Sequence, residues 1–221
     1  MRGNQMRRRW WAFFATLLAL VLTGAATPAA TAAAPTTLRY DDLPAAQAHQ
    51  KGFVLDPGIW PNRAVTFSFG TGTTDLGGAA QRNAVRSAIA LWQNASGLRF
   101  TEVAAGGQIQ FSYVTGNHGD GNSFDGVGGV LAHAFFPPPT NTNPIAGDTH
   151  FDDAEIWTNA TRPAGGQPID LVTVAAHEIG HAIGLRHSAD SSALMFAFYG
   201  GSHRFLGQDD INGVRAKYGA P

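Results

Sequence analysis

The chain has 221 residues, a length that favours one domain with a sizeable core, and 44% of its residues are hydrophobic. Only 14% are charged and the formal net charge at pH 7 is -1, so the chain has neither a basic field for nucleic acid nor an acidic tail. It contains no Cys, which excludes disulfide bonds, so stability must come from the core and from any bound metal ions.

The N-terminal residues have the pattern of a secretory signal peptide. Residues 1–9 carry four Arg and no acidic residue, and the apolar run from Trp10 to Leu22 is too short to span a bilayer comfortably. Small residues that suit a cleavage site follow through Ala34. The alternative is a signal anchor, although nothing after Leu22 continues the apolar run. We therefore predict a signal peptide over 1–34, a secreted extracellular protein, and no stable membrane association after its removal.

The rest of the chain divides into a short segment and one domain. Residues 35–52 have little periodicity, and we interpret them as a linker or short pro-segment before a domain at 53–221. Within that domain, apolar residues at helical spacing predict an amphipathic helix between Gly78 and Ser96. Alternation at period two predicts strands. These strands are Val65–Phe69, Arg99–Val103, Gln108–Val114, Val130–Phe135 and a short one over Gly147–Trp157.

The most informative stretch reads H-E-x-x-H-x-x-G-x-x-H from His177 to His187. On a helix, His177 and His181 project from the same face toward one ion, and Glu178 lies beside them, where its carboxylate reaches a water on that ion. Gly184 permits a positive φ, so the chain can leave the helix and return His187 as a third ligand. Three His with one open position hold a catalytic zinc. A chance match in an amphipathic helix is the alternative, but the added Gly and His make it rare.

A Gly-rich stretch before this motif, together with the strands that follow it, carries further ligand types. Three His and one Asp make a closed four-ligand set that suits a structural zinc. The four residues are His118, Asp120, His133 and His150. Carboxylates at Asp125, Asp152 and Glu155, with carbonyls of the Gly-rich loop, suit a hard cation such as calcium. Spacing alone leaves the second zinc open, and the alternative for each Asp-Gly pair is an ordinary turn.

Taken in order, these motifs resemble the catalytic domain of the matrix metalloproteinases, the matrixin family of the metzincins. The similarity covers roughly Phe53 to Gly219, and the overall pattern is similar to a secreted, minimal matrixin of bacterial type. The motifs that carry it are His118-Gly-Asp120, Phe124-Asp125-Gly126, Val130-Leu-Ala-His133-Ala, Asp148-Thr-His150-Phe-Asp152-Asp, His177 to Ser188, Ala193-Leu-Met195 and Gln208-Asp-Asp-Ile-Asn-Gly213.

The resemblance implies an α/β (α+β) metzincin fold with a twisted mixed sheet of about five strands and three helices, the last over Asp209–Tyr218. It implies two zinc ions. His177, His181 and His187 would hold the catalytic one, with Glu178 as general base, and the set around His118 would hold a structural one. It also implies at least one calcium. Its ligands would be the side chains of Asp125, Asp152 and Glu155 and the main-chain carbonyls of Gly126, Gly128 and Val130.

The resemblance also assigns residues around the cleft. Met195 stands where the family has its Met-turn beneath the catalytic zinc. The edge strand at Leu131 and Ala132 would pair with an extended substrate, and one substrate side chain would enter a pocket near Thr173 and Tyr199.

Several positions depart from the family pattern. The family's propeptide uses a Cys to keep the enzyme latent, and this chain has none, so either it is made active or another group blocks the metal. Asp41 and Asp42 precede the domain, and a carboxylate block by one of them is a hypothesis. Ala197 replaces the Pro that usually follows the Met-turn, and the loop Gly200–Gly207 is short, which leaves specificity open. Gln108 stands where a second calcium site would have Asp.

The sequence therefore predicts a secreted zinc metalloendopeptidase, a hydrolase that cleaves extended protein or peptide substrates. We also expect the protein to be a monomer. A zinc-bound water would attack the peptide carbonyl while Glu178 accepts its proton. The alternatives are a catalytically silent secreted zinc-binding or adhesion module of the same fold, another metzincin branch, and an amidase or deformylase. Glu178 argues against the silent module, because a purely structural site has no use for that carboxylate.

Overall fold

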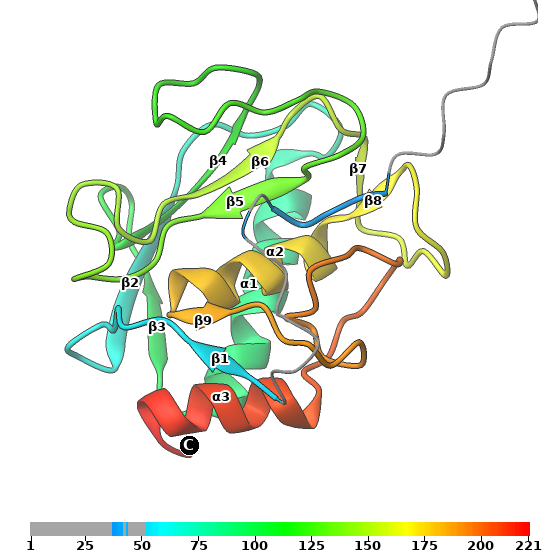
Figure 1. Ribbon diagram of the computed structural model, residues 1–221. Helices are drawn as coiled ribbons and strands as arrows, with labels where there is room; N and C mark the ends of the chain where they lie inside the picture. The colour runs from blue at the N-terminus through cyan, green and yellow to red at the C-terminus, as the bar shows by residue number, and fades with distance from the viewer. Residues whose placement is uncertain (1–36, 42, 44–51) are drawn as a thin grey trace, which may run out of the picture. The chain divides into compact units, whose positions relative to one another are not determined.

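A five-stranded mixed sheet is the main layer of the fold (Figure 1). Three of its four pairings are parallel, and only the last strand, β5, runs antiparallel to its neighbour β6. This agrees with the predicted mixed sheet. In spatial order the strands are β3 (Arg99–Glu102), β2 (Ala64–Phe69), β4 (Ile109–Val114), β6 (Thr149–Asp152) and β5 (Ala132–Ala134).

The computed structural model describes residues 37–41, 43 and 52–221, and these belong to one unit of the chain, Pro35–Pro221. The predicted signal peptide, Asp42 and residues 44–51 lie outside the described residues. Within the described ranges, no helix combines the length and the apolar character needed to cross a bilayer.

Alternating burial explains why the central strands form. In β4 the side chains of Ile109, Phe111 and Tyr113 are buried and the residues between them are only half-buried. Phe111 and Tyr113 both stack against Phe151 of the neighbouring β6. Such aromatic pairs between adjacent strands stabilise the sheet beyond the area that they bury.

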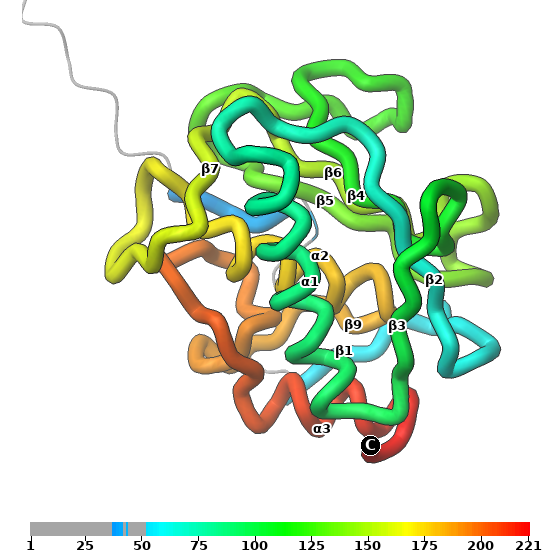
Figure 2. The backbone as a smooth tube through the Cα atoms, turned by 180° about the vertical axis from the view of Figure 1, so that it is seen from behind, coloured from blue at the N-terminus to red at the C-terminus, as the bar shows by residue number. Residues whose placement is uncertain are grey.

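Among the described residues three helices, as expected, pack on the sheet and on one another: α1 (Gly78–Ala95), α2 (Leu171–Ala182) and α3 (Gln208–Tyr218). The buried face of α1 includes Val85, Ile89 and Trp92, whose spacing is helical. The indole nitrogen of Trp92 donates to the carbonyl of Ala176, 2.8 Å away, and so ties α1 to α2. Figure 2 shows α1 from behind, with β3 beside it and α3 near its end.

Two small sheets were not predicted. β1 (Val54–Leu55) pairs with β9 (Leu185–Arg186), and β7 (Trp157–Thr158) pairs with β8 (Ile169–Asp170). Strands of two residues are too short to produce an alternating pattern, so the sequence carries no signal for them.

Strand β5 is shorter than the strand predicted over Val130–Phe135. It pairs with β6 only through Ala132, His133 and Ala134, while Val130 forms a parallel bridge with Arg39 instead. The edge of the sheet is therefore covered in part by residues from the segment that precedes the domain.

Candidate metal centres

Helix α2 positions the first two His of the H-E-x-x-H motif. The carboxylate of Asp170 caps the helix by accepting from the amide of Val172 at 3.1 Å. Every residue of the helix is buried, so His177 and His181 project from it into the interior of the protein.

The turn at Gly184 returns the chain toward this helix. Gly184 has a φ of 92°, as the sequence predicted, and a Cβ there would lie 2.5 Å from the carbonyl oxygen of Gly58. Only Gly fits both the conformation and the space. The chain then forms β9 and places His187 beside the two His of the helix.

The three imidazoles converge through their Nε2 atoms. Nε2 of His177 lies 3.1 Å from that of His181 and 3.3 Å from that of His187. Nδ1 of His177 donates to the carbonyl of Leu194 at 2.8 Å, and Nδ1 of His181 donates to that of Leu185 at 2.7 Å. In the neutral form each of these rings has its one N–H on Nδ1, and Nε2 then presents a lone pair rather than a proton.

These facing lone pairs fit a cation. In a tetrahedral zinc site with Zn–N bonds of 2.0–2.1 Å, two ligand nitrogens lie about 3.3 Å apart, which matches the separations here. Burial, together with His181 and His187, lowers the pKa of His177 well below its ordinary value, which keeps that ring in the neutral form that binds metal.

Glu178 is the neighbouring acid-base group. It is fully buried, and neither of its carboxylate oxygens receives a hydrogen bond from any described residue. Burial, and next the charge of Asp41, raises the pKa of Glu178 well above its ordinary value. A buried carboxylate of raised pKa beside three converging His is suited to accept and return a proton.

Asp210 holds the turn that contacts His177, a role that was not predicted from the sequence. Its buried carboxylate accepts from the amides of Leu194, Met195 and Gly207 at 2.7, 3.1 and 2.8 Å. The carbonyl of Leu194 is in turn the partner of His177. The Gln208–Gly213 motif was the available signal, but no local pattern identifies the amides that its carboxylate binds.

Met195, the residue assigned to the Met-turn, lies against α2. A Cβ added at Gly180 would lie 2.3 Å from its sulfur, so helix and turn are in close contact because residue 180 has no side chain. Met195 is almost fully buried.

The second predicted set also converges. Oδ2 of Asp120 lies 2.7 Å from Nε2 of His118, 2.7 Å from Nε2 of His133 and 2.9 Å from Nδ1 of His150. The nitrogens of His133 and His150 are 3.1 Å apart, and those of His118 and His133 are 3.4 Å apart. Burial lowers the pKa of His133 to about 4, although Asp120 acts in the opposite direction. Four close ligand atoms with neutral imidazole fit a closed structural zinc site.

The predicted calcium ligands are close but do not converge in the same way. Burial raises the pKa of Glu155 to about 7, and the charges of Asp152 and Asp125 add to the effect. The amide of Gly128 donates to Glu155 at 2.7 Å and that of Val130 to Asp125 at 3.1 Å. Across the described ranges, only the two His clusters bring three or more His or carboxylate ligand atoms within 4.8 Å of one another.

The residues expected to bind substrate lie in two places. Leu131 and Ala132 are at the edge of the sheet, where their amides donate to carbonyls of Arg39 and Tyr40. Thr173 and Tyr199 meet at Asp170. Thr173 donates to its carboxylate at 2.7 Å, and the hydroxyl of Tyr199 accepts from its amide at 3.0 Å.

Asp41, one of the two carboxylates raised as a possible block, joins the cluster of His177, His181 and His187. One of its oxygens lies 2.7 Å from Nε2 of His181, and the side chain is buried. The four residues form one of the two groups of converging ligand atoms.

Comparisons with known proteins agree with this geometry. The model of the peptidase family Matrixin (M10) matches residues 59–219. Karilysin of Tannerella forsythia is 44% identical over 171 residues, which cover 76% of this chain and 35% of the relative. Interstitial collagenase of Bos taurus is 45% identical over 171 residues, which cover 76% of this chain and 34% of the relative. Hatching enzyme of Paracentrotus lividus is 44% identical over 173 residues, which cover 76% of this chain and 28% of the relative. The chain thus spans about a third of the length of these curated relatives.

Proposed function

Because this chain belongs to the matrixin family, we propose that it is a zinc-dependent endopeptidase that is secreted and cleaves extended protein or peptide substrates. The observation that carries the proposal is the convergence of three Nε2 atoms beside the buried carboxylate of Glu178, which has no hydrogen-bond donor among the described residues. We expect the enzyme to act as a monomer in the extracellular space.

The roles of the residues follow from their positions. His177, His181 and His187 would hold a zinc ion, which supplies Lewis acidity that activates water and polarises a peptide carbonyl. Glu178 would accept a proton from the attacking water at one carboxylate oxygen. As the C–N bond breaks, the same oxygen would return that proton to the departing amine. The proton balance closes on Glu178, and no covalent bond to the protein is needed.

The substrate would bind at the side of β5 that faces away from β6, where Arg39 and Tyr40 lie in this structure. That strand pairs with β6 on one side only, and its main-chain groups near Leu131 and Ala132 can bind an extended peptide by strand addition. A substrate side chain would then enter the pocket near Thr173 and Tyr199. Ala197 and the short loop Gly200–Gly207 form the wall that would select this side chain.

The other metal centres would be structural. The set around His118 offers four ligands and no open position, so a second zinc there would stabilise the loop that contains Asp120. Asp125, Asp152 and Glu155, with the carbonyls of Gly126, Gly128 and Val130, would hold a calcium ion once their side chains close around it. One oxygen of Asp152 is buried without a donor among the described residues, which supports a cation at this place.

Metal content and turnover on the same sample test the function. The protein is expressed from its full sequence, and Glu178→Gln is compared with the parent by zinc analysis and by cleavage of casein with and without chelator. We expect two zinc ions in both proteins, chelator-sensitive cleavage in the parent, and a decrease of about 10²- to 10⁴-fold in the variant, since only the base is lost. Near-normal turnover of Glu178→Gln would contradict the mechanism. Two zinc ions without cleavage by any form would favour a latent chain or the silent zinc-binding module.

A further inference from the structure

The segment that precedes the domain lies between the two walls of the cleft. In Figure 1 it is the blue stretch beside β5. Residues 38–40 form main-chain hydrogen bonds with 129–132 on one side and with 197–199 on the other. The bonds run from Arg39 N to Gly129 O (2.8 Å), Leu131 N to Arg39 O (3.1 Å), Ala132 N to Tyr40 O (2.9 Å), Tyr40 N to Ala197 O (3.3 Å) and Tyr199 N to Leu38 O (3.2 Å). The segment thus uses the edge-strand amides that a substrate would need.

Tyr40 fills the space next to the catalytic cluster. Its ring stacks on that of His177, with centroids 3.8 Å apart and an interplanar angle of 6°, and it meets Tyr199 edge to face at 5.7 Å. Only 3% of the residue is exposed. The ring therefore covers His177 on the side where Tyr199 lines the proposed substrate pocket.

Asp41 is directed at the three His. Oδ2 lies 2.7 Å from Nε2 of His181, and Oδ1 lies 3.4 Å from Nε2 of His187. In the neutral ring whose Nδ1 donates to the carbonyl of Leu185, Nε2 of His181 has no proton to give to this carboxylate, and a cation bound by both atoms accounts for their 2.7 Å contact.

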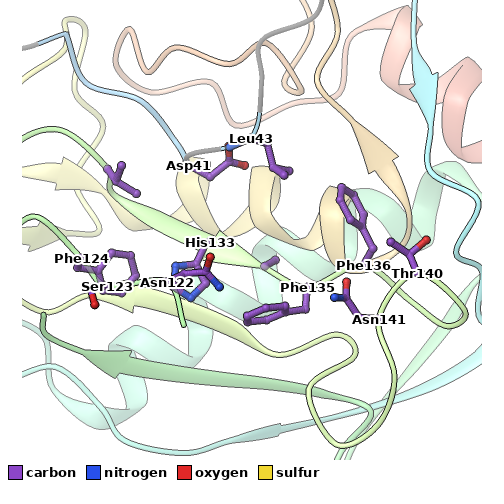
Figure 3. Close-up of a pocket in the computed structure, with 12 residues that line it drawn as sticks. Asp41, Leu43, Asn122, Ser123, Phe124, His133, Phe135, Phe136, Thr140 and Asn141 are labelled. Atoms are coloured by element: carbon purple, nitrogen blue, oxygen red, sulfur yellow. The ribbon is translucent and has the colours of Figure 1, made fainter. Parts of the chain in front are cut away.

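A local turn fixes the orientation of this carboxylate. The amide of Leu43 donates to Oδ1 of Asp41 at 2.7 Å, which is the geometry of an Asx-turn and leaves Oδ2 directed at His181. Figure 3 shows Asp41 and Leu43 together at the pocket that Phe136 and Thr140 also line. Residues on both sides of Asp41 therefore hold it in place.

We propose that Leu38–Asp41 is an autoinhibitory segment, in which Asp41 occupies the fourth ligand position of the catalytic metal and Tyr40 covers His177, so that the intact chain is latent. This inference rests on the proposed function, because it requires that His177, His181 and His187 bind zinc. The segment would block the site because its carbonyls at Arg39 and Tyr40 occupy the edge-strand amides that a substrate would use.

Cleavage of the chain between Leu43 and Gly52 would activate the enzyme. While the chain is intact, Asp41 is an intramolecular ligand, whose effective concentration is on the order of millimolar. A cut after Leu43 makes it an intermolecular ligand held only by the short segment's own contacts, and dilution then favours release. Activation therefore requires one peptide bond to break and no rearrangement of the domain.

The test compares Asp41→Asn with the parent and with Asp42→Asn, which removes the same charge at the next residue. Asn retains the turn-forming oxygen but is a poor zinc ligand. All three are expressed from the full sequence and checked intact by mass spectrometry. The readouts are the binding rate of a fluorescent peptide hydroxamate, which needs the fourth ligand position, and the initial rate of casein cleavage. We expect both rates to rise at least about tenfold in Asp41→Asn and to stay at the parent value in Asp42→Asn.

The two readouts separate this inference from the function. The inference would be overturned if hydroxamate bound to the parent and to Asp41→Asn at the same rate. It would also be overturned if Asp42→Asn raised this rate as much as Asp41→Asn does. Neither result would contradict the proposed peptidase activity. Faster hydroxamate binding without casein cleavage would support the autoinhibitory segment and contradict the proposed endopeptidase activity. If Asp41→Asn fails to fold, a specific protease site placed within residues 44–51 of the parent replaces it. Complete cutting there must then raise hydroxamate binding, and an unchanged rate would overturn the proposal.

Discussion

The two His clusters have similar ligand types but differ in where the carboxylate comes from. In the cluster around His118, Asp120 lies two residues from the first His and sits among all three rings. In the cluster around His177, Asp41 lies more than a hundred residues away and outside the matched family region, which begins at residue 59. A ligand built into its own loop closes a site permanently, whereas a ligand from a separate segment can be withdrawn.

Burial sharpens this contrast. His177 and His181 are fully buried, and Glu178 lies beside them without a donor among the described residues. The members of the other cluster are only partly buried. Among the described residues, none of these ligands has a neighbour in sequence like Glu178, a buried carboxylate that lacks a hydrogen-bond donor. The cluster around His177 is therefore suited to proton transfer, and the cluster around His118 is suited to stabilising the fold.

Replacing a His of the first cluster should have the largest effect on activity. We expect His181→Ala to reduce bound zinc from two ions to one and to reduce casein cleavage to background, because two His cannot hold a catalytic zinc. Zinc analysis by mass spectrometry and the casein assay on the same sample check this. Full occupancy with two zinc ions would show that His181 is not a ligand.

Replacing a His of the second cluster should act mainly on stability. If His133→Ala weakens structural zinc binding by 10²- to 10³-fold, the loss of folding free energy is about 3–4 kcal/mol. For a domain of this size that corresponds to a fall in Tm of roughly 6–16 °C. Calorimetry measures it, and cleavage below the new Tm should persist. An unchanged Tm would argue against a structural zinc. A loss of cleavage in protein that is still folded would show that this cluster, too, is needed for activity.

The smallest expected effect concerns calcium and pH. The pKa of Glu155 is raised from 4.5 to about 7 by burial and then by Asp152 and Asp125. Between these values the folded protein holds a proton that the unfolded chain does not, so calcium-free protein should lose stability as pH rises through this window. Calcium requires the ionised form, so its stabilising effect should grow over the same range.

Melting curves in calcium and in EGTA, at about pH 5 and about pH 8, test this linkage. The increase in Tm produced by calcium should be larger at the higher pH, and Glu155→Gln should abolish the difference. A calcium effect of the same size at both pH values would show that Glu155 does not bind the ion.

The interactions that the sequence could not predict are those between distant segments. Asp210 binds the amides of Leu194 and Met195, and Asp41 reaches His181, yet no periodic pattern connects these residues. The hypothesis of a carboxylate block named both Asp41 and Asp42, because a sequence does not show which of two adjacent side chains faces a site. Chain path and turn geometry decide that, through the hydrogen bond from Leu43 to Asp41.

The sequence by itself determined the elements whose pattern is local. Helical spacing places His177 and His181 on one face of α2, a Gly at 184 permits the φ that returns His187, and alternation at period two marks the buried side chains of β4. Only the tertiary structure decided which carboxylate meets the three His, which amides Asp210 holds, and how far the three predicted calcium ligands approach one another. Periodicity follows from the geometry of a single element, whereas these contacts depend on how separate elements pack, and that is set by the whole chain at once.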